Sequence, residues 1–301
     1  MDSDCAVVVL AASIVSTACV AWNANRSFIP IDPALPFFGR QPAPTPAPAR
    51  SHPSSDSWII ASAAAGTGLF LYGLYKFVDP YVFQFVIDAV VCIAQAAALA
   101  VVLSTFMDNF YAERLSSGVG MVEFLAFFLV SSILILATKQ SYNIVTNIAN
   151  AVLAYLVCFT VSLPTMKTAI LYMLLFWLID IVYVYGIPVM PALSSSQPSL
   201  PCLVFVFNEA KLKLGLGDII VPSIFLKSIQ AYSSTFKRPQ FIRLSVSGYL
   251  VGILVSGIVA CHGDAIPCMM FLAPALLLPN LLLALANRSI DQFLEYHLGE
   301  A

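Results

Sequence analysis

The sequence has few charged residues and no concentration of basic ones. Only 10% of its 301 residues are Asp, Glu, Lys or Arg, against about a quarter in an ordinary soluble domain. The formal net charge is -2, and the Lys and Arg residues are dispersed rather than gathered in the basic stripe that nucleic acid requires. This composition argues against a soluble domain and against a nucleic-acid partner.

The sequence also lacks the spacing of a metal site or a disulfide framework. Its seven cysteines are an odd number, no two of them form a Cys-x-x-Cys pair, and the histidines do not cluster. Several cysteines lie inside apolar stretches, namely Cys19, Cys92, Cys158 and Cys268. We therefore expect free, buried thiols, and these residues indicate no metal site.

What the sequence does contain is long apolar runs. Hydrophobic residues make up 60% of the chain, and inside a bilayer only helices or closed barrels satisfy the backbone. Runs of about 17 to 25 apolar residues have the length of a membrane-spanning helix. Nine runs predict an all-α membrane protein with nine transmembrane helices: Cys5–Trp22, Trp58–Tyr75, Tyr81–Phe106, Met121–Ala137, Ile144–Leu163, Ala169–Gly186, Leu214–Tyr232, Leu244–Cys261 and Ile266–Ala286.

Two of these runs have a second interpretation. The first run resembles a signal peptide in length, but it lacks a basic n-region and a small-residue cleavage site, which favours a retained helix. The fifth run carries Thr146, Asn147 and Asn150. It is either a helix that faces the bundle or no membrane span.

The runs divide the chain into residues 1–168 with the first five helices, residues 169–286 with the last four, and a C-terminal tail at residues 287–301. Residues 23–57 separate the first two helices and include the sequence Pro-Ala-Pro-Thr-Pro-Ala-Pro-Ala. Such a composition forms extended polyproline segments and buries nothing, so we expect a linker.

The distribution of basic residues predicts the orientation in the membrane. Lys and Arg accumulate in short cytosolic loops. With the N-terminus outside, the cytosolic segments hold ten of the fourteen basic residues: Arg26, Arg40, Arg50, Arg114, Lys167, Lys227, Lys237, Arg238, Arg243 and Arg288. We therefore expect a lumenal N-terminus and a cytosolic C-terminus.

Acidic residues at membrane depth are candidates for function, because a buried charge there is costly. Asp88, Asp180 and Asp218 qualify. At about 1.5 Å per helical residue, Asp180 lies about 9 Å from the outer end of the sixth run and Asp218 about 7 Å inside the seventh. Because these two runs are consecutive and antiparallel, the two carboxyls would face each other. For Asp88 we favour a structural polar contact within the bundle.

Two carboxyls in one site share a single proton, as in aspartic proteases. One carboxylate accepts a proton from water that attacks a peptide carbonyl, and its protonated partner donates to the carbonyl oxygen. Gly215 and Gly217 flank Leu216 immediately before Asp218, and glycine there allows close backbone approach and irregular entry to a helix. The alternative is a small-residue packing patch with no catalytic role.

These residues resemble the GxGD aspartyl proteases, the family of presenilins and signal peptide peptidases. The segment from Gly215 to Phe225 is similar to the family's second catalytic segment, which reads GLGD, apolar residues, Pro, a small residue and Phe. The first catalytic segment of the family begins Tyr-Asp. Here Ile179 precedes Asp180, so the Asp is retained and the Tyr is not.

The family's third signature is Pro-Ala-Leu near the start of its last helix. Literal copies begin at Pro33, Pro191 and Pro274. Signal peptide peptidases place a second Pro seven residues after the first, which favours the segment Pro267, Cys268 and Met269 as the equivalent, with Pro274 as the downstream proline. The alternative active-site segment is Pro274, Ala275 and Leu276.

The resemblance implies a presenilin-like bundle and an intramembrane aspartyl endopeptidase with Asp180 and Asp218 as the catalytic pair. The expected orientation is similar to that of signal peptide peptidases, which implies remnant signal peptides and type II membrane segments as substrates. It also implies the endoplasmic reticulum membrane, no cofactor, lipid contact and self-association.

The segment from Leu203 to Phe207 is β-prone and precedes the GLGD motif. A strand here, including Leu203, Val204 and Phe205, would position an unwound substrate by β-augmentation, or it simply caps the bundle. Two rival functions stay open. An inactive family member would act as a membrane binding protein, and an ion- or proton-coupled transporter would also use intramembrane acids, although no paired repeat is visible.

Overall fold

The computed structural model describes the chain from its second apolar run onward, with gaps. The described residues are 62, 66, 69–70, 72–73, 76–111, 121–138, 144–161, 163–186, 202–207, 210–260 and 267–297. The first predicted span, the proline-rich linker and most of the second predicted span lie outside these residues. So do the Pro-Ala-Leu copies at Pro33 and Pro191.

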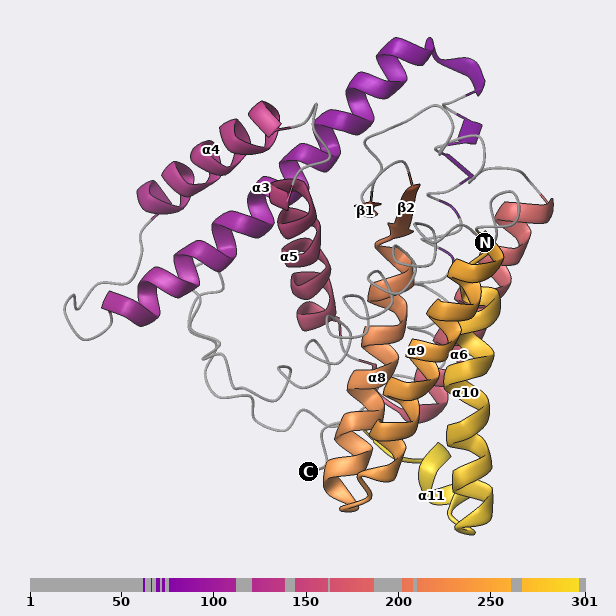
Figure 1. Ribbon diagram of the computed structural model, residues 1–301. Helices are drawn as coiled ribbons and strands as arrows, with labels where there is room; N and C mark the ends of the chain where they lie inside the picture. Colours follow the sequence, from indigo (N-terminus) through magenta and orange to yellow (C-terminus); the bar gives the residue numbers. More distant parts are fainter. Residues whose placement is uncertain are drawn as a thin grey trace.

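The described part is almost entirely helical, with one β-hairpin (Figure 1). The helices are α3 (Pro80–Tyr111), α4 (Met121–Thr138), α5 (Ile144–Thr160), α6 (Met166–Ile181), α8 (Gly217–Thr235), α9 (Gln240–Ala260), α10 (Met269–Ala286) and α11 (Ile290–Leu294). A π-helical turn, η1 (Val182–Gly186), continues α6. The antiparallel strands are β1 (Cys202–Phe207) and β2 (Ala210–Gly215).

The structure bears out the membrane assignment in part. Four helices are long and apolar enough to cross a bilayer, by length and composition: Tyr81–Ser104, Met166–Gly186, Gln240–Ala260 and Met269–Ala286. Seven of the nine predicted spans overlap a described helix. Within the described residues, the helices that correspond to the fourth, fifth and seventh predicted spans are not both long and apolar enough to count as membrane spans. Nine membrane spans are therefore a prediction, and a helical membrane protein is the finding.

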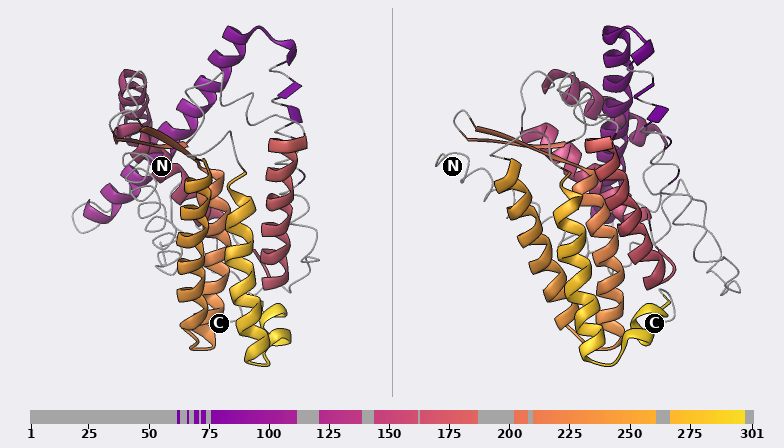
Figure 2. Two further views of the ribbon diagram at one scale, coloured as in Figure 1. Left: turned by 45° about the vertical axis from the view of Figure 1, so that its right-hand side comes forward. Right: turned by 90° about the vertical axis from the view of Figure 1, so that its right-hand side faces the viewer.

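Helices α6, α8, α9 and α10 stand side by side as one bundle (Figure 1). Two further views show the same four helices running together, with the hairpin at one end of the bundle (Figure 2). Helices α9 and α10 approach each other closely, where Gly248 of α9 faces the backbone of Ala275. The absence of a side chain at Gly248 allows this contact, as small residues do between helices in membranes.

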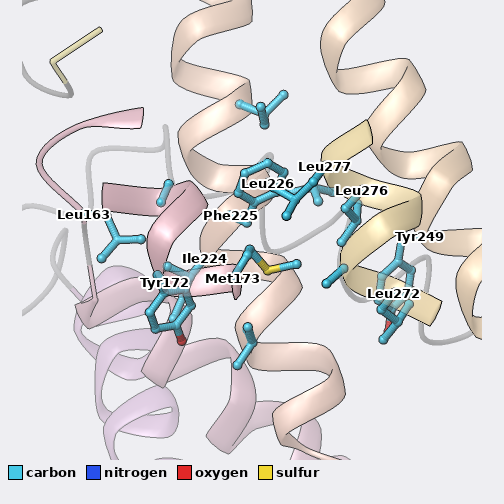
Figure 3. Close-up of a cluster of buried hydrophobic side chains, with 14 of the residues drawn as sticks. Leu163, Tyr172, Met173, Ile224, Phe225, Leu226, Tyr249, Leu272, Leu276 and Leu277 are labelled. Atoms are coloured by element: carbon cyan, nitrogen blue, oxygen red, sulfur yellow. The ribbon is translucent and has the colours of Figure 1, made fainter. Parts of the chain in front are cut away.

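One large apolar cluster lies between these helices. It includes fully buried side chains from α6, α8, α9 and α10, among them Met173, Phe225, Tyr249 and Leu272 (Figure 3). Close packing of such side chains, rather than exclusion of water, holds helices together within lipid. The cluster therefore fixes the relative positions of the four helices.

Helices α3, α4 and α5 form a second group beside this bundle, and α5 contacts both α8 and β1 (Figure 1). The buried amide of Asn150 on α5 accepts a hydrogen bond from Gln95 Nε2 of α3 at 2.6 Å and donates to the Cys202 carbonyl of β1 at 2.8 Å. Asn150 thus lies in the protein interior. The fifth run is a helix that contacts α3, α8 and β1, and its crossing of the membrane stays a prediction.

Helices α8 and α10 end in the same way. Lys237 and Arg288 adopt positive φ angles of 52° and 50° just beyond the two helices. The next amides, of Arg238 and Ser289, bond back to carbonyls five residues earlier at 2.9 Å in both cases, which is the Schellman termination. The chain then turns sharply into the following element.

The residues after α10 fold back on the bundle. Phe293 of α11 is fully buried, and Tyr296 accepts a backbone hydrogen bond from Met166 at the start of α6, over 3.1 Å. The Phe293 ring also packs edge-on against Tyr232 of α8, with 5.1 Å between the ring centroids. The segment Ile290–His297 therefore closes the end of the bundle opposite the hairpin (Figure 1).

One predicted boundary is wrong. The seventh span was expected to begin at Leu214, but Leu214 and Gly215 belong to β2, where they pair with Leu203 and Cys202. The helix begins at Gly217. The ladder with β1 supplies backbone partners for residues that an apolar run alone would place in a helix.

Candidate active site

Asp218 lies in the first turn of α8, at the point where the hairpin becomes a helix (Figure 2). Strand β2 ends at Gly215, and the Gly215 backbone forms a hydrogen bond with the Asp218 carboxyl. A Cβ atom at Gly215 would stand only 3.2 Å from Asp218 Oδ2. Glycine at this position therefore leaves room for the carboxyl to fold back over the end of the strand.

The surroundings of Gly217 are different. It is exposed, and a Cβ atom built there would meet nothing within 4 Å. The two glycines of the motif thus act differently: Gly215 accommodates the carboxyl, and Gly217 borders open space beside it. The depth estimate for Asp218 assumed a helix from Lys213, and it is wrong in that respect because Lys213 to Gly215 form a strand.

Asp180 lies in the last turn of α6, immediately before the π-helical turn η1. Its Oδ2 accepts a hydrogen bond from the backbone N–H of Met269 at 2.9 Å. That N–H belongs to the first turn of α10, where backbone donors have no partner within the helix. Asp180 thus caps α10 from another helix, and π-helical turns next to such groups are frequent at functional sites.

The structure brings the two predicted aspartates together. The carboxyls of Asp180 and Asp218 lie within electrostatic reach of each other, and α6 contacts α8 along the bundle. Both side chains are half-buried. Two carboxyls in such a setting can hold one proton between them and act as an acid and base pair. The third acid, Asp88, lies in α3, which packs against α4 and α5.

The proline frame at Pro267 lies at this site. Met269 bonds to Asp180, and the thiol of Cys268 lies within electrostatic reach of both carboxyls. Pro274 lies five residues after Met269 along α10, which is about 7.5 Å at the helical rise. The backbone of Ala275, the next residue, packs on Gly248 of α9. The geometry therefore favours Pro267, Cys268 and Met269 over Pro274, Ala275 and Leu276 as the segment beside the acids.

Two side chains of α9 reach the site and were not singled out by sequence reasoning. Ser256 Oγ lies 3.1 Å from Cys268 Sγ, and the Tyr249 hydroxyl donates a hydrogen bond to the Asp218 carbonyl at 3.1 Å. A polar residue in an apolar membrane helix is the signal that points to each of them. Among the residues that the structure describes, no three His, Cys, Asp or Glu side chains gather as a metal site.

Comparison with known proteins settles the family. Residues 58–299, which include both aspartates, match the family described as signal peptide peptidase. This chain belongs to the signal peptide peptidase family. The match begins at the second predicted span and extends to the segment that closes the bundle after α11.

Two curated relatives share parts of this region. Intramembrane protease 2 of Caenorhabditis elegans is 24% identical over 198 residues, which cover 58% of this chain and 42% of that protein. Signal peptide peptidase-like 2B of Rattus norvegicus is 28% identical over 166 residues, covering 44% of this chain and 28% of that protein. The chain thus spans less than half the length of the curated relatives it matches.

The sequence also associated the hairpin of this signal peptide peptidase family member with the site. The predicted strand from Leu203 to Phe207 is confirmed as β1, in register with β2 through the pairs Leu203 with Leu214, Val204 with Lys213 and Phe205 with Leu212. Leu203 is buried against the bundle. The hairpin leads directly into the turn that carries Asp218.

Proposed function

We propose that this chain is an intramembrane aspartyl endopeptidase that hydrolyses transmembrane helices with Asp180 and Asp218 as its catalytic pair. The observation that carries the proposal is that these two carboxyls, 38 positions apart in sequence, lie within electrostatic reach of each other where α6 contacts α8. The relatives named intramembrane protease 2 and signal peptide peptidase-like 2B support the same activity.

The mechanism follows from two carboxyls that share one proton. The ionised carboxyl accepts a proton from water, and the hydroxide oxygen forms a bond to the scissile carbonyl carbon. The protonated carboxyl donates its proton to the carbonyl oxygen, which gives a neutral tetrahedral diol. The carboxyl that took a proton from water then donates it to the peptide nitrogen, while the other carboxylate accepts a proton from one diol hydroxyl. The C–N bond breaks, a carboxylic acid and an amine leave the site, and the pair again holds one proton.

The surroundings of the pair suit an extended substrate. Gly217 leaves open space next to Asp218, and the hairpin stands beside the same end of α8. A helix must unwind before its peptide bond is accessible to water and acids. Pairing of the unwound segment with a strand edge of the hairpin, at Leu203, Val204 and Phe205 or along β2, would hold it extended. Substrate positioning by the hairpin is part of this proposal.

The proposal extends to the substrates and the membrane. Remnant signal peptides and type II membrane segments have the polarity that a lumenal N-terminus and a cytosolic C-terminus would select, and the endoplasmic reticulum membrane is where such segments arise. Four apolar helices of membrane length and the family assignment support a membrane location. Lipid contact and self-association belong to the same proposal.

The test is cleavage of a fluorescent signal-peptide substrate by the purified full chain in detergent. We expect the wild type to cleave and the variants Asp180→Asn and Asp218→Asn, which keep side-chain size, to lose all measurable turnover. Asp88→Asn is the matched control, because it removes the third intramembrane acid, on α3, and should keep most of the activity.

The other functions predict different results. A wild type that binds the peptide without cleaving it would support an inactive family member that acts as a binding protein. Cleavage that persists in either aspartate variant would remove the pair from the mechanism. Peptide-independent proton or cation flux in proteoliposomes, lost in Asp180→Asn, would favour a transporter.

A further inference from the structure

The helix that carries Asp218 contains a proline at one particular distance from it. In an α-helix each carbonyl accepts a hydrogen bond from the N–H four residues later. The residue four positions after Asp218 is Pro222, which lies inside α8 and has no N–H. The Asp218 carbonyl therefore lacks the donor that a regular helix would provide.

Tyr249 of α9 supplies a donor to this carbonyl. Its hydroxyl donates to the Asp218 carbonyl oxygen at 3.1 Å, and the Tyr249 side chain is fully buried. Tyr249 belongs to the apolar cluster that joins the helices (Figure 3). In such surroundings a carbonyl without a partner is costly, so the phenol takes the place of the missing amide.

The same pair of helices thus holds both acids. Asp180 accepts the N–H of Met269 at the start of α10, and the Asp218 backbone accepts the hydroxyl of Tyr249 on α9. Helices α9 and α10 are in turn fixed to each other through the close contacts of Gly248 and Gly252. One rigid unit therefore sets the position of each aspartate relative to the other.

We propose that Tyr249 is a positioning residue for the aspartate pair: its hydroxyl replaces the amide that Pro222 lacks and holds the Asp218 backbone so that the carboxyl faces Asp180. This inference rests on the proposed protease function. The proline loosens the first turn of α8, and the hydroxyl fixes it in one arrangement. A small shift of a reacting group is enough to lower the rate strongly.

The test combines substitutions of Tyr249 and Pro222, because the proposal says that the Tyr249 hydroxyl replaces the amide that Pro222 lacks. Tyr249→Phe removes only the hydroxyl, and we expect kcat for the signal-peptide substrate to fall by about 10- to 100-fold with KM nearly unchanged, because substrate contacts stay in place. In a Pro222→Ala background the N–H of residue 222 is restored. There the same Tyr249→Phe change should lower kcat by less than about threefold, since the carbonyl already has a donor.

Tyr232→Phe is the matched control. Tyr232 is also fully buried in α8, and its hydroxyl has no hydrogen-bond partner among the described residues. We expect wild-type kcat in that variant. Thermal unfolding in detergent, measured for all four members of the Pro222 and Tyr249 cycle, gives a second readout that does not depend on activity.

The outcomes are separable. Equal kcat losses from Tyr249→Phe in both backgrounds, or an equal loss in Tyr232→Phe, would overturn the positioning role. A wild type that does not cleave would overturn the proposed function and the positioning role with it, although coupling in thermal unfolding would still demonstrate the hydrogen bond. Coupling in both kcat and unfolding temperature would establish the inference.

Discussion

Met269 and Asp180 lie 89 positions apart in sequence and are joined by a single hydrogen bond, from the Met269 N–H to Asp180 Oδ2, of 2.9 Å. The bond ties the first turn of α10 to the last turn of α6. It satisfies one of the free backbone donors at the start of α10 and orients the carboxyl at the same time. Met269 is therefore part of the candidate site through its backbone rather than through its side chain.

The first prediction removes this donor. Met269→Pro deletes the backbone N–H at the first position of α10, where the amide has no partner within the helix. Because Cys268 is in the αR conformation, the proline also shifts that residue, which adds to the loss. We expect kcat for peptide cleavage to fall about 100-fold as Asp180 loses its orientation. The measurement is cleavage of the signal-peptide substrate, with circular dichroism to check that the helices are intact.

Met269→Leu is the control for this change. Leucine keeps the N–H and a side chain of similar volume at a buried position, so activity should stay within about threefold of wild type. Equal losses in the proline and leucine variants would show that the Met269 side chain, and not its amide, is what the site requires.

Apolar runs in the sequence predict most of the helices, but they do not predict where α8 begins. Leu214 and Gly215 continue the apolar run in composition, and they become a strand because β1 offers them a backbone ladder. A partner on a separate segment is not visible in the local pattern. That Asp180 and Asp218 come within electrostatic reach of each other agrees with the expectation for two neighbouring helices, although the depth estimate behind it took part of β2 for helix.

The other contacts of the site were harder to foresee, each for its own reason. The bond from Met269 to Asp180 comes from a backbone amide, which leaves no signature in residue type. The bond from Tyr249 does have a signature in the sequence. Pro222, four residues after Asp218, has no N–H, so the Asp218 carbonyl needs another donor. Asn150 signalled a polar contact, while its partners on α3 and β1 depended on the tertiary arrangement.

The second prediction concerns the contact between α9 and α10. A Cβ atom at Gly248 would collide with the Ala275 carbonyl, and backbone cannot yield as a flexible side chain does. Gly248→Ala should therefore push the two helices apart and lower the free energy of unfolding by about 1 to 3 kcal/mol. Thermal unfolding in detergent or controlled denaturation in SDS checks the change.

Gly217→Ala provides the contrast. Its Cβ would meet nothing within 4 Å, so the unfolding temperature should stay close to that of the wild type. If the open space beside Asp218 receives the substrate, the same methyl group should instead raise KM or lower kcat. A Gly248→Ala variant as stable as Gly217→Ala would contradict the close packing of α9 on α10.

The third prediction concerns Cys268, whose thiol lies within electrostatic reach of both carboxyls and 3.1 Å from Ser256 Oγ. In the alignment of Pro267, Cys268 and Met269 with the family's Pro-Ala-Leu, which is the one that we favour, this position corresponds to the small residue alanine. Cys268→Ala removes the contact with Ser256 and keeps the space, and it should retain activity within about threefold. Cys268→Leu adds bulk beside both acids and should reduce kcat by about 100-fold.

A matched substitution at Cys158 separates crowding of the acids from crowding of the core. Cys158 is buried in α5, where its thiol reaches the Ile220 carbonyl of α8 at 3.8 Å. Cys158→Leu should lower the unfolding temperature without a comparable loss of kcat in the protein that remains folded. Cys268→Leu should lower kcat more than the unfolding temperature, because its added carbons lie beside both carboxyls. Full activity in Cys268→Leu would show that the start of α10 does not border the reacting groups.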